Sequence, residues 1–242
     1  MNAVASSSTA MNAVASSSTA MNAVASSSTA MNAVASSQIG VNTIINNSGF
    51  LNIVISSSTA MSAIAGSSTA MSAIAGSSTA MSAIAGSSTA MSAIAGSSTA
   101  MSAIAGKPVA ISSIIKSTMA CSKIDSKIQS YRSTLVNSLN NASYFTKTTE
   151  ISTNSNGNGT TLDRTLYTGN KIIIPTQFRD KGSGANTITL YSSSTNIQIY
   201  NTTITQTTVS ITSGVALRGV RELHGTYFPN ENEITYDVYT AR

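Results

Sequence analysis

The sequence predicts an α+β chain with three consecutive parts. They are a fibrous decapeptide-repeat shaft of short helices at residues 1–110, a short coiled-coil-like helical neck at 111–143, and an antiparallel β-rich distal domain at 144–242. Three observations support this division. A ten-residue block recurs through the first part, apolar residues recur three or four apart in the second, and short strand-like segments separated by turns fill the third.

The shaft is predicted from the register of its blocks. MNAVASSSTA begins at residues 1, 11 and 21, and MSAIAG begins at 61 and at each tenth residue up to 101. The two blocks of residues 41–60 differ in sequence, but they keep an apolar residue at block position one and Val or Ile at position four. Apolar spacing therefore matters more than residue identity.

Helix caps indicate how each block folds. In AGSSTAMSAIAG, Gly is a natural residue just after a helix and Ser a natural N-cap, and Lys107-Pro108 places Pro at the first helical position. We therefore expect eight helical residues, STAMSAIA, followed by a Gly-Ser link. A β-solenoid is the alternative, but alternation would put Ile64 and Met61 on opposite faces. The residues predicted to pack inside the shaft are Met61, Ile64, Met71 and Ile74.

The shortness of these helices predicts several chains. An eight-residue helix is not stable alone in water, and each block offers only Met, Ile and Ala for burial. We expect copies to wind together, each covering the apolar residues of the others. The predicted shaft is therefore intertwined, and the helix caps together with the seam spacing of the neck favour a trimer.

The neck shows spacing close to a heptad. Its seam is predicted at Ile114, Cys121, Ile124, Ile128, Tyr131 and Leu135. Ile at both seam positions favours three or four strands over two. A single amphipathic helix packed on the distal domain is the alternative.

The distal domain reads as a series of short strands. Strand-like segments lie at 171–175, 186–192, 196–204, 207–212 and 233–239, with Gly- and Asn-rich turns between them. Such a series predicts an antiparallel sandwich or barrel.

The sequence gives no pattern for catalysis, a cofactor or a metal. The distal carboxylates show no pairing, and His224 is the only histidine, for which we expect a surface or trimer-axis position. Cys121 is the only cysteine, so no intrachain disulfide is possible. We predict a protein that is not an enzyme.

Charge and hydropathy argue against two kinds of partner, nucleic acid and membrane. The net charge is +5, but Lys and Arg are scattered over residues 107–242, which argues against nucleic acid. No apolar run approaches 18 residues, which argues against membrane insertion. Loops on a β scaffold are the usual place for recognition, and we expect a receptor-binding surface at Arg218, Arg221, His224 and Tyr227.

The tandem STAMNAVASS and STAMSAIAGS units, over about residues 1–120, resemble the decapeptide arrays of bacteriophage fibre proteins. The order of repeat, helical neck and β-rich end is also similar to tail or head fibres. The resemblance implies a homotrimer on the virion that contacts other virion proteins and displays a tip for a host-surface glycan or protein. Tail fibres normally begin with a domain that docks onto the virion, whereas this chain begins inside the repeat, so either end could attach.

The predicted function is a structural phage fibre with a spacer shaft and a host-attaching β domain. The alternatives are an extracellular filament or adhesin subunit that is not viral, and a repeat-based ice-binding solenoid. A depolymerase spike is disfavoured because the carboxylates are not paired.

Overall fold

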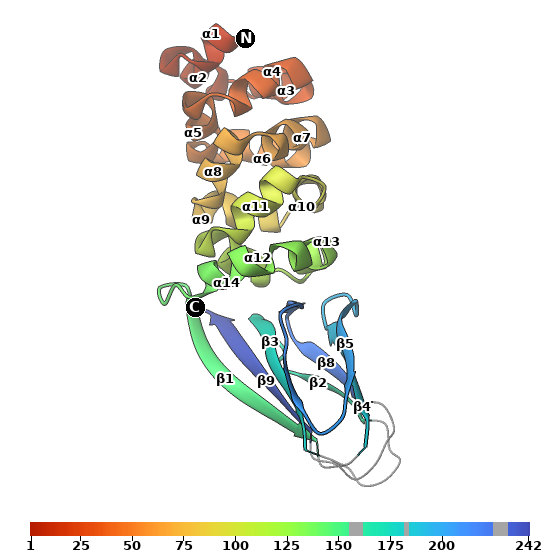
Figure 1. The fold of residues 1–242 in the computed structure, drawn as a ribbon. Coiled ribbons are helices and arrows are strands. Elements are labelled where there is room, and N and C mark those ends of the chain that lie inside the picture. The colour runs from red at the N-terminus through yellow and green to blue at the C-terminus, as the bar shows by residue number, and fades with distance from the viewer. Residues whose placement is uncertain (155–161, 182–183, 225–231) are drawn as a thin grey trace. The chain divides into compact units, whose positions relative to one another are not determined.

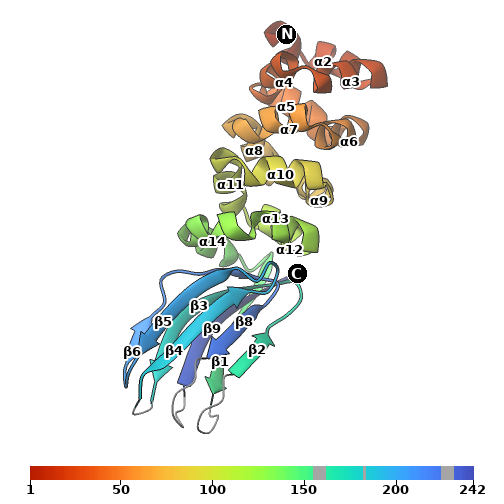
Figure 2. The same cartoon turned by 90° about the vertical axis from the view of Figure 1, so that its right-hand side faces the viewer.

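The computed structural model describes residues 1–154, 162–181, 184–224 and 232–242. The chain forms two compact units, residues 1–127 and 128–242 (Figures 1 and 2). The first unit is helical and the second is mainly antiparallel β structure, so the predicted α+β class is confirmed. The boundary differs from the prediction, because the first unit extends well beyond residue 110.

The first unit consists of short helices joined by two-residue or one-residue links. They are α1 (Asn2–Ala5), α2 (Ser8–Ala15), α3 (Ser18–Ser26), α4 (Ser28–Ala35), α5 (Gln38–Asn46), α6 (Ser48–Ser56), α7 (Ser58–Gly66), α8 (Ser68–Ala75), α9 (Ser78–Ala85), α10 (Ser88–Ala95), α11 (Ser98–Ala105), α12 (Pro108–Ile115) and α13 (Thr118–Ile128).

The serine at block position seven caps most of the helices, as the sequence predicts, whereas Asn47 caps α6 and Lys107 before α12 makes no side-chain cap. Ser67 has an extended backbone, and its hydroxyl accepts a hydrogen bond from the backbone N–H of Ala70, so α8 begins at Ser68. The expectation for glycine is wrong. Gly76 has φ −84° and ψ −10°, an ordinary right-handed conformation that Ser16 adopts at the equivalent place. No left-handed turn ends these helices, so glycine is not required there.

The helices wind into a solenoid with three helices in each coil. Helices three apart in order lie against each other, as α4 does on α7 and α7 on α10. The chain turns sharply at each link, for example by 98° between α6 and α7. One coil therefore takes three blocks, or thirty residues. The solenoid is defined here as residues 1–127.

The core of the solenoid is made by one chain. Met61, Ile64, Met71 and Ile74 are all buried, together with the alanines of block positions five and ten in the interior blocks. Their cover comes from neighbouring helices of the same chain. The inference that separate chains must cover these residues is therefore wrong, because the links let the chain fold back on itself.

The same serines also join successive coils. The Ser67 hydroxyl donates to the Ala35 carbonyl oxygen at 2.6 Å, across 32 residues of sequence. Ser57 makes the equivalent bond to Ala25 at 2.8 Å. Asn47 does both jobs with its amide, accepting from Phe50 N–H and donating to the Ala15 carbonyl. Each of these side chains thus caps one helix and ties it to the coil before.

The predicted continuous neck helix is not formed. α12 ends at Ile115, and Ser117 caps the next helix by accepting from Ala120 N–H at 3.2 Å. Ile114, Cys121 and Ile124 are buried, but they occupy positions four, one and four of two further blocks. The steps of three and seven between them fit the ten-residue register as well as a heptad. The repeat therefore continues where a coiled coil was predicted.

The rest of the predicted neck belongs to the second unit. A 3-10 turn, η1 (Gln129–Tyr131), and α14 (Arg132–Leu139) follow α13. Gln129 exchanges two hydrogen bonds with the backbone of Val215, and Arg132 donates to the carbonyls of Gly214 and Pro175. Of the remaining seam residues, Ile128 and Leu135 are buried and Tyr131 is half-buried.

Nine strands make up the β part of this unit in the described residues. They are β1 (Phe145–Asn154), β2 (Leu162–Leu166), β3 (Lys171–Asp180), β4 (Asn186–Ser192), β5 (Gln198–Ile204), β6 (Thr208–Ser210), β7 (Ala216–Leu217), β8 (Val220–His224) and β9 (Asn232–Ala241).

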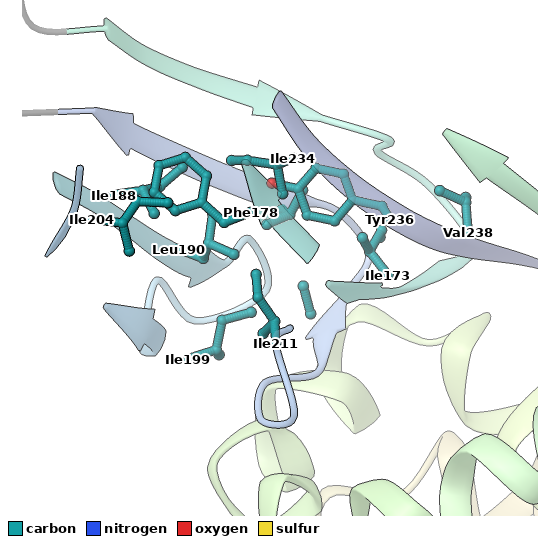
Figure 3. Close-up of a cluster of buried hydrophobic side chains, with 12 residues drawn as sticks. Ile173, Phe178, Ile188, Leu190, Ile199, Ile204, Ile211, Ile234, Tyr236 and Val238 are labelled. Carbon is teal, nitrogen blue, oxygen red and sulfur yellow. The ribbon is translucent and has the colours of Figure 1, made fainter. Parts of the chain in front are cut away.

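The strands form a sandwich of two antiparallel sheets. One has the order β1-β9-β3-β6, with β7 also paired to β3, and the other has the order β2-β8-β4-β5. Buried apolar side chains from both sheets make one cluster, in which Phe178, Leu190 and Ile234 lie at its centre (Figure 3). The predicted sandwich is thus present.

Candidate functional site

The predicted receptor-binding residues do not come together. Arg221 and His224 lie on strand β8 rather than on a loop, and their side chains point to opposite faces of the sheet. Arg218 precedes β8, six residues from His224, which corresponds to about 20 Å along an extended chain. Tyr227 lies outside the described residues.

Arg218 is held in the turn between β7 and β8. Its φ is +62° and that of Gly219 is +130°, so the chain makes a left-handed turn there. The Arg218 N–H donates to the Lys171 carbonyl, and its Nη1 donates to Asn170 Oδ1, both at 2.8 Å. One nitrogen of its guanidinium is therefore bound to Asn170 in the preceding turn.

Arg221 forms a flat polar group on the outer face of the second sheet. Its Nε and Nη2 donate to the two carboxylate oxygens of Asp163 at 2.8 and 2.6 Å, and Nη1 donates to Asn196 Oδ1 at 2.9 Å. Its guanidinium carbon lies 5.3 Å from the centre of the Tyr191 ring. We call Asp163, Tyr191, Asn196 and Arg221 the Arg221 platform.

The Arg221 platform contains one positive and one negative side chain. Hydrogen bonds from Arg221 lower the pKa of Asp163, so both partners stay charged and neutralise each other. Hydroxyl groups continue the same face, where Thr187 and Thr203 Oγ1 atoms lie 2.6 Å apart. Such a surface offers a fixed guanidinium plane, an aromatic ring and many neutral hydrogen-bonding groups. That chemistry suits a polar ligand such as a saccharide.

The inward residues of β8 form a different cluster. Glu222 is fully buried, and it accepts hydrogen bonds from Tyr236 Oη at 2.6 Å, Arg164 Nε at 2.8 Å and Ser152 Oγ at 3.0 Å. His224 Nε2 lies 3.3 Å from the same carboxylate. We call these five residues the Glu222 cluster. The expectation of a surface or axial histidine is therefore wrong.

The Glu222 cluster joins the two sheets. Ser152 and Tyr236 come from β1 and β9 of one sheet, whereas Arg164 and Glu222 come from β2 and β8 of the other. Burial acts to raise the pKa of Glu222, but the hydrogen bonds from His224, Tyr236 and Arg164, with the charge of Arg164, outweigh it and lower the pKa. Glu222 is thus an ionised carboxylate that a substrate cannot reach in this conformation.

The described part of the chain has no cluster typical of a metal site and no single helix typical of a membrane span. No group of three or more His, Cys, Asp or Glu side chains lies together there. No single helix in that part is long and apolar enough to span a membrane, and only the bent pair α6 and α7 passes by composition.

Comparisons with known proteins leave the family open. Neither a protein-family model nor a curated protein sequence matches this chain.

The sequence prediction included Arg221 and His224 but did not indicate the Glu222 cluster. The signal was present in VRELH, residues 220–224, because alternation places Val220, Glu222 and His224 on one face. Val220 belongs to the core, so Glu222 and His224 must face the core as well.

Proposed function

We propose that this chain is a structural fibre of a phage virion, with the solenoid as a spacer and the sandwich attaching to the host surface. The observation that carries the proposal is the self-contained coil of the solenoid. Each coil repeats the same caps, the same core positions and the same cross-coil hydrogen bonds. Three added blocks should therefore add one coil, or about 8–10 Å of length.

The outer surface of the solenoid suits a spacer. The exposed block positions carry mostly Ser, Thr, Asn, Gly or Ala, with Met1, Gln38 and Ile39 as exceptions, and no charged residue precedes Lys107. Such a surface has no charge with which to attract partners from a distance. Recognition is therefore assigned to the sandwich, where charged and aromatic side chains are concentrated.

Within the sandwich, the Arg221 platform is the proposed host contact. Its side chains are held by their mutual hydrogen bonds before any ligand arrives, which reduces the entropy lost on binding. The proposed ligand is a host-surface glycan or protein. The resemblance to phage fibres further implies a homotrimer attached to other virion proteins. Since the solenoid core is complete in one chain, trimer contacts would use outer surfaces.

Two measurements test this function. Antibodies against the solenoid should label an appendage on purified phage particles in electron micrographs, whereas labelling of cell-surface filaments alone would favour the adhesin alternative. The labelled full chain should bind host cells, and Arg221→Ala combined with Tyr191→Ala should weaken binding about tenfold or more.

Arg218→Ala is the matched control for this test, because Arg218 is also an arginine of the sandwich and its Nη1 donates to Asn170. This substitution should change the affinity for host cells by no more than about twofold, because Arg218 is not part of the proposed contact. Equal losses in both variants would exclude the platform as the contact.

A further inference from the structure

Strand β1 is the longest free edge of the sandwich. Within the described residues it has ten residues and pairs only with β9, whereas the other edge strands, β2, β5 and β6, have five, seven and three. All ten residues of β1 pair with β9 in one continuous register, without a bulge. Its sequence, FTKTTEISTN, contains no Pro or Gly.

Most of the usual protections of an edge are missing from β1, which has one inward-facing charge, the half-buried Glu150. Natural edges are blunted by proline, by bulges, by short length or by lysines that project over the edge. Lys147 is the one lysine of β1, and its ammonium lies 2.8 Å from Asp237 of β9 and 5.6 Å from the Tyr239 ring centre. It is therefore drawn back over the sheet and does not shield the free edge.

The side chains of β1 are also open on both faces. Ile151, on the outer face, is 60 % exposed, the highest value among the large apolar residues of the described chain. Thr146 and Thr148 are on the inner face, yet they are exposed, so the second sheet does not cover this half of the strand. The middle of the strand, residues 146–149, is thus open on both faces, whereas Phe145 and Ser152 near its ends are buried.

We propose that β1 pairs antiparallel with β1 of a second copy of this chain, about a two-fold axis at Thr149. A two-fold axis makes any antiparallel edge complementary to itself, because each backbone donor meets the equivalent acceptor. The ten-residue edge supplies the main-chain groups, and Ile151 supplies the apolar contact.

Charge fixes the register. Residues opposite each other in an antiparallel pair lie on the same face of the sheet. The two-fold axis must therefore pass through a residue, so that odd-numbered positions of one copy lie opposite odd-numbered positions of the other. An axis at Lys147 or at Glu150 would place like charges directly opposite. An axis at Thr148 pairs residues 145–151, and an axis at Thr149 pairs residues 145–153. The Phe145 N–H already donates to the Asn141 carbonyl, and the Thr153 carbonyl accepts from Arg164, so the contact is made mainly by residues 147–151, on which the Thr149 axis is centred.

The Thr149 register also gives Ile151 a partner. It places Ile151 opposite Lys147 of the second copy, whose aliphatic stem can cover it while the ammonium stays with Asp237. Glu150 meets Thr148 of the second copy. No like charges face each other in this arrangement.

This pairing does not depend on the proposed fibre function. If other surfaces hold the chains together in threes, pairing through β1 joins two such trimers into a hexamer. It requires that the assembled species contain an even number of chains. Blocking β1 should therefore halve the mass, whatever that number is.

The experiment is multi-angle light scattering of the full chain at about 100 μM, where a micromolar contact is largely formed. Ile151→Lys sets two ammonium groups opposite each other at both ends of the pair, and it should weaken pairing about tenfold and halve the mass when diluted. Ile151→Glu sets opposite charges together and should keep the wild-type mass.

Asn201→Lys, at an exposed position on the edge strand β5, is the matched control and should not change the mass. Circular dichroism identical to the wild type would show that each variant is folded. A wild-type chain with an odd number of copies, or equal masses for Ile151→Lys and Ile151→Glu, would overturn the proposal.

Discussion

At the scale of single residues, the serine of block position seven has two partners. As acceptor, Ser67 Oγ satisfies the N–H of Ala70, which no helical carbonyl can reach. As donor, the same oxygen satisfies the Ala35 carbonyl in the coil before. A hydroxyl or an amide can do both, and a carboxylate can only accept. This explains why Asn47 can replace serine at this position.

Substitutions of Ser67 should separate the two roles. Ser67→Ala loses the cap and the cross-coil bond, at about 1 kcal/mol each, so about 2 kcal/mol of stability should disappear. Ser67→Asn should be close to the wild type. Ser67→Asp keeps the cap but turns a carboxylate toward a carbonyl, and it should be as destabilising as Ser67→Ala. Urea unfolding followed by helical circular dichroism measures these differences, and a wild-type midpoint for Ser67→Asp would show that the donor role is unimportant.

Glu222 gives the sandwich a specific pH dependence. Its pKa in the folded chain lies below the ordinary value of 4.5. Ionised Glu222 therefore contributes stability that is fully present above pH 4.5 and is lost as the pH falls through the folded pKa. Glu222→Gln should cost about 3 kcal/mol at pH 7, because Arg164 and the other donors lose their charged partner. It should also flatten the decline of stability below pH 4.5.

The control for this prediction is Asp163→Asn, which breaks an exposed ion pair with another arginine. It should change the pH 7 stability much less, because water screens that pair. Urea midpoints of β structure from pH 7 to pH 3 compare the two. Equal effects would mean that burial of Glu222 is not what makes it important.

At the scale of elements, the sequence predicted those whose pattern is local. The serine cap places the start of α8 at the predicted Ser68, and the alternation of residues 186–192 gives β4 with the predicted bounds. Both signals lie within about ten residues, and tertiary contacts do not override them.

The elements that were missed lack such a pattern. β1 carries threonines on both faces, because half of it is open to solvent, so no apolar alternation marks it. The neck was misread for a different reason. Ile114, Cys121 and Ile124 fit two periods, and only the cap at Ser117 distinguishes another block from a heptad. The Arg221 platform also needs β2 beside β8, a pairing that no local pattern reports.

At the scale of the whole molecule, the solenoid and the sandwich differ in how far apart in the sequence their contacting residues lie. In the solenoid, each helix packs on helices about thirty residues away in the sequence. Successive coils are therefore equivalent, and the length of the solenoid increases with the number of blocks. The sandwich takes its order from distant pairings such as β1 with β9. Charge follows the same division, because it is confined to residues after 106. A spacer and a contact domain on one chain would have these separate requirements.

Charges placed in the core test whether the solenoid is complete in one chain. Ile64, Ile74 and Ile84 are at most 1 % exposed, and replacing all three with Asp buries three charges that have no partner. If one chain forms the core, the variant should lose solenoid helix even when it is monomeric, since each charge costs several kcal/mol. The control is Ser62→Asp, Ser72→Asp and Ser82→Asp together, at exposed positions of the same blocks, which should keep the helix.

Circular dichroism together with light scattering distinguishes the two kinds of shaft. In the isoleucine variant, an intertwined shaft would dissociate into monomers that had lost their mutual contacts. A single-chain solenoid would lose helix, but the number of chains joined through β1 would not change. The deciding quantity is helical content measured at a concentration where the wild type is fully dissociated. Wild-type helix that persists there requires a core supplied by one chain. Helix that vanishes on dilution of the wild type would mean that the Met and Ile residues are covered by other copies after all.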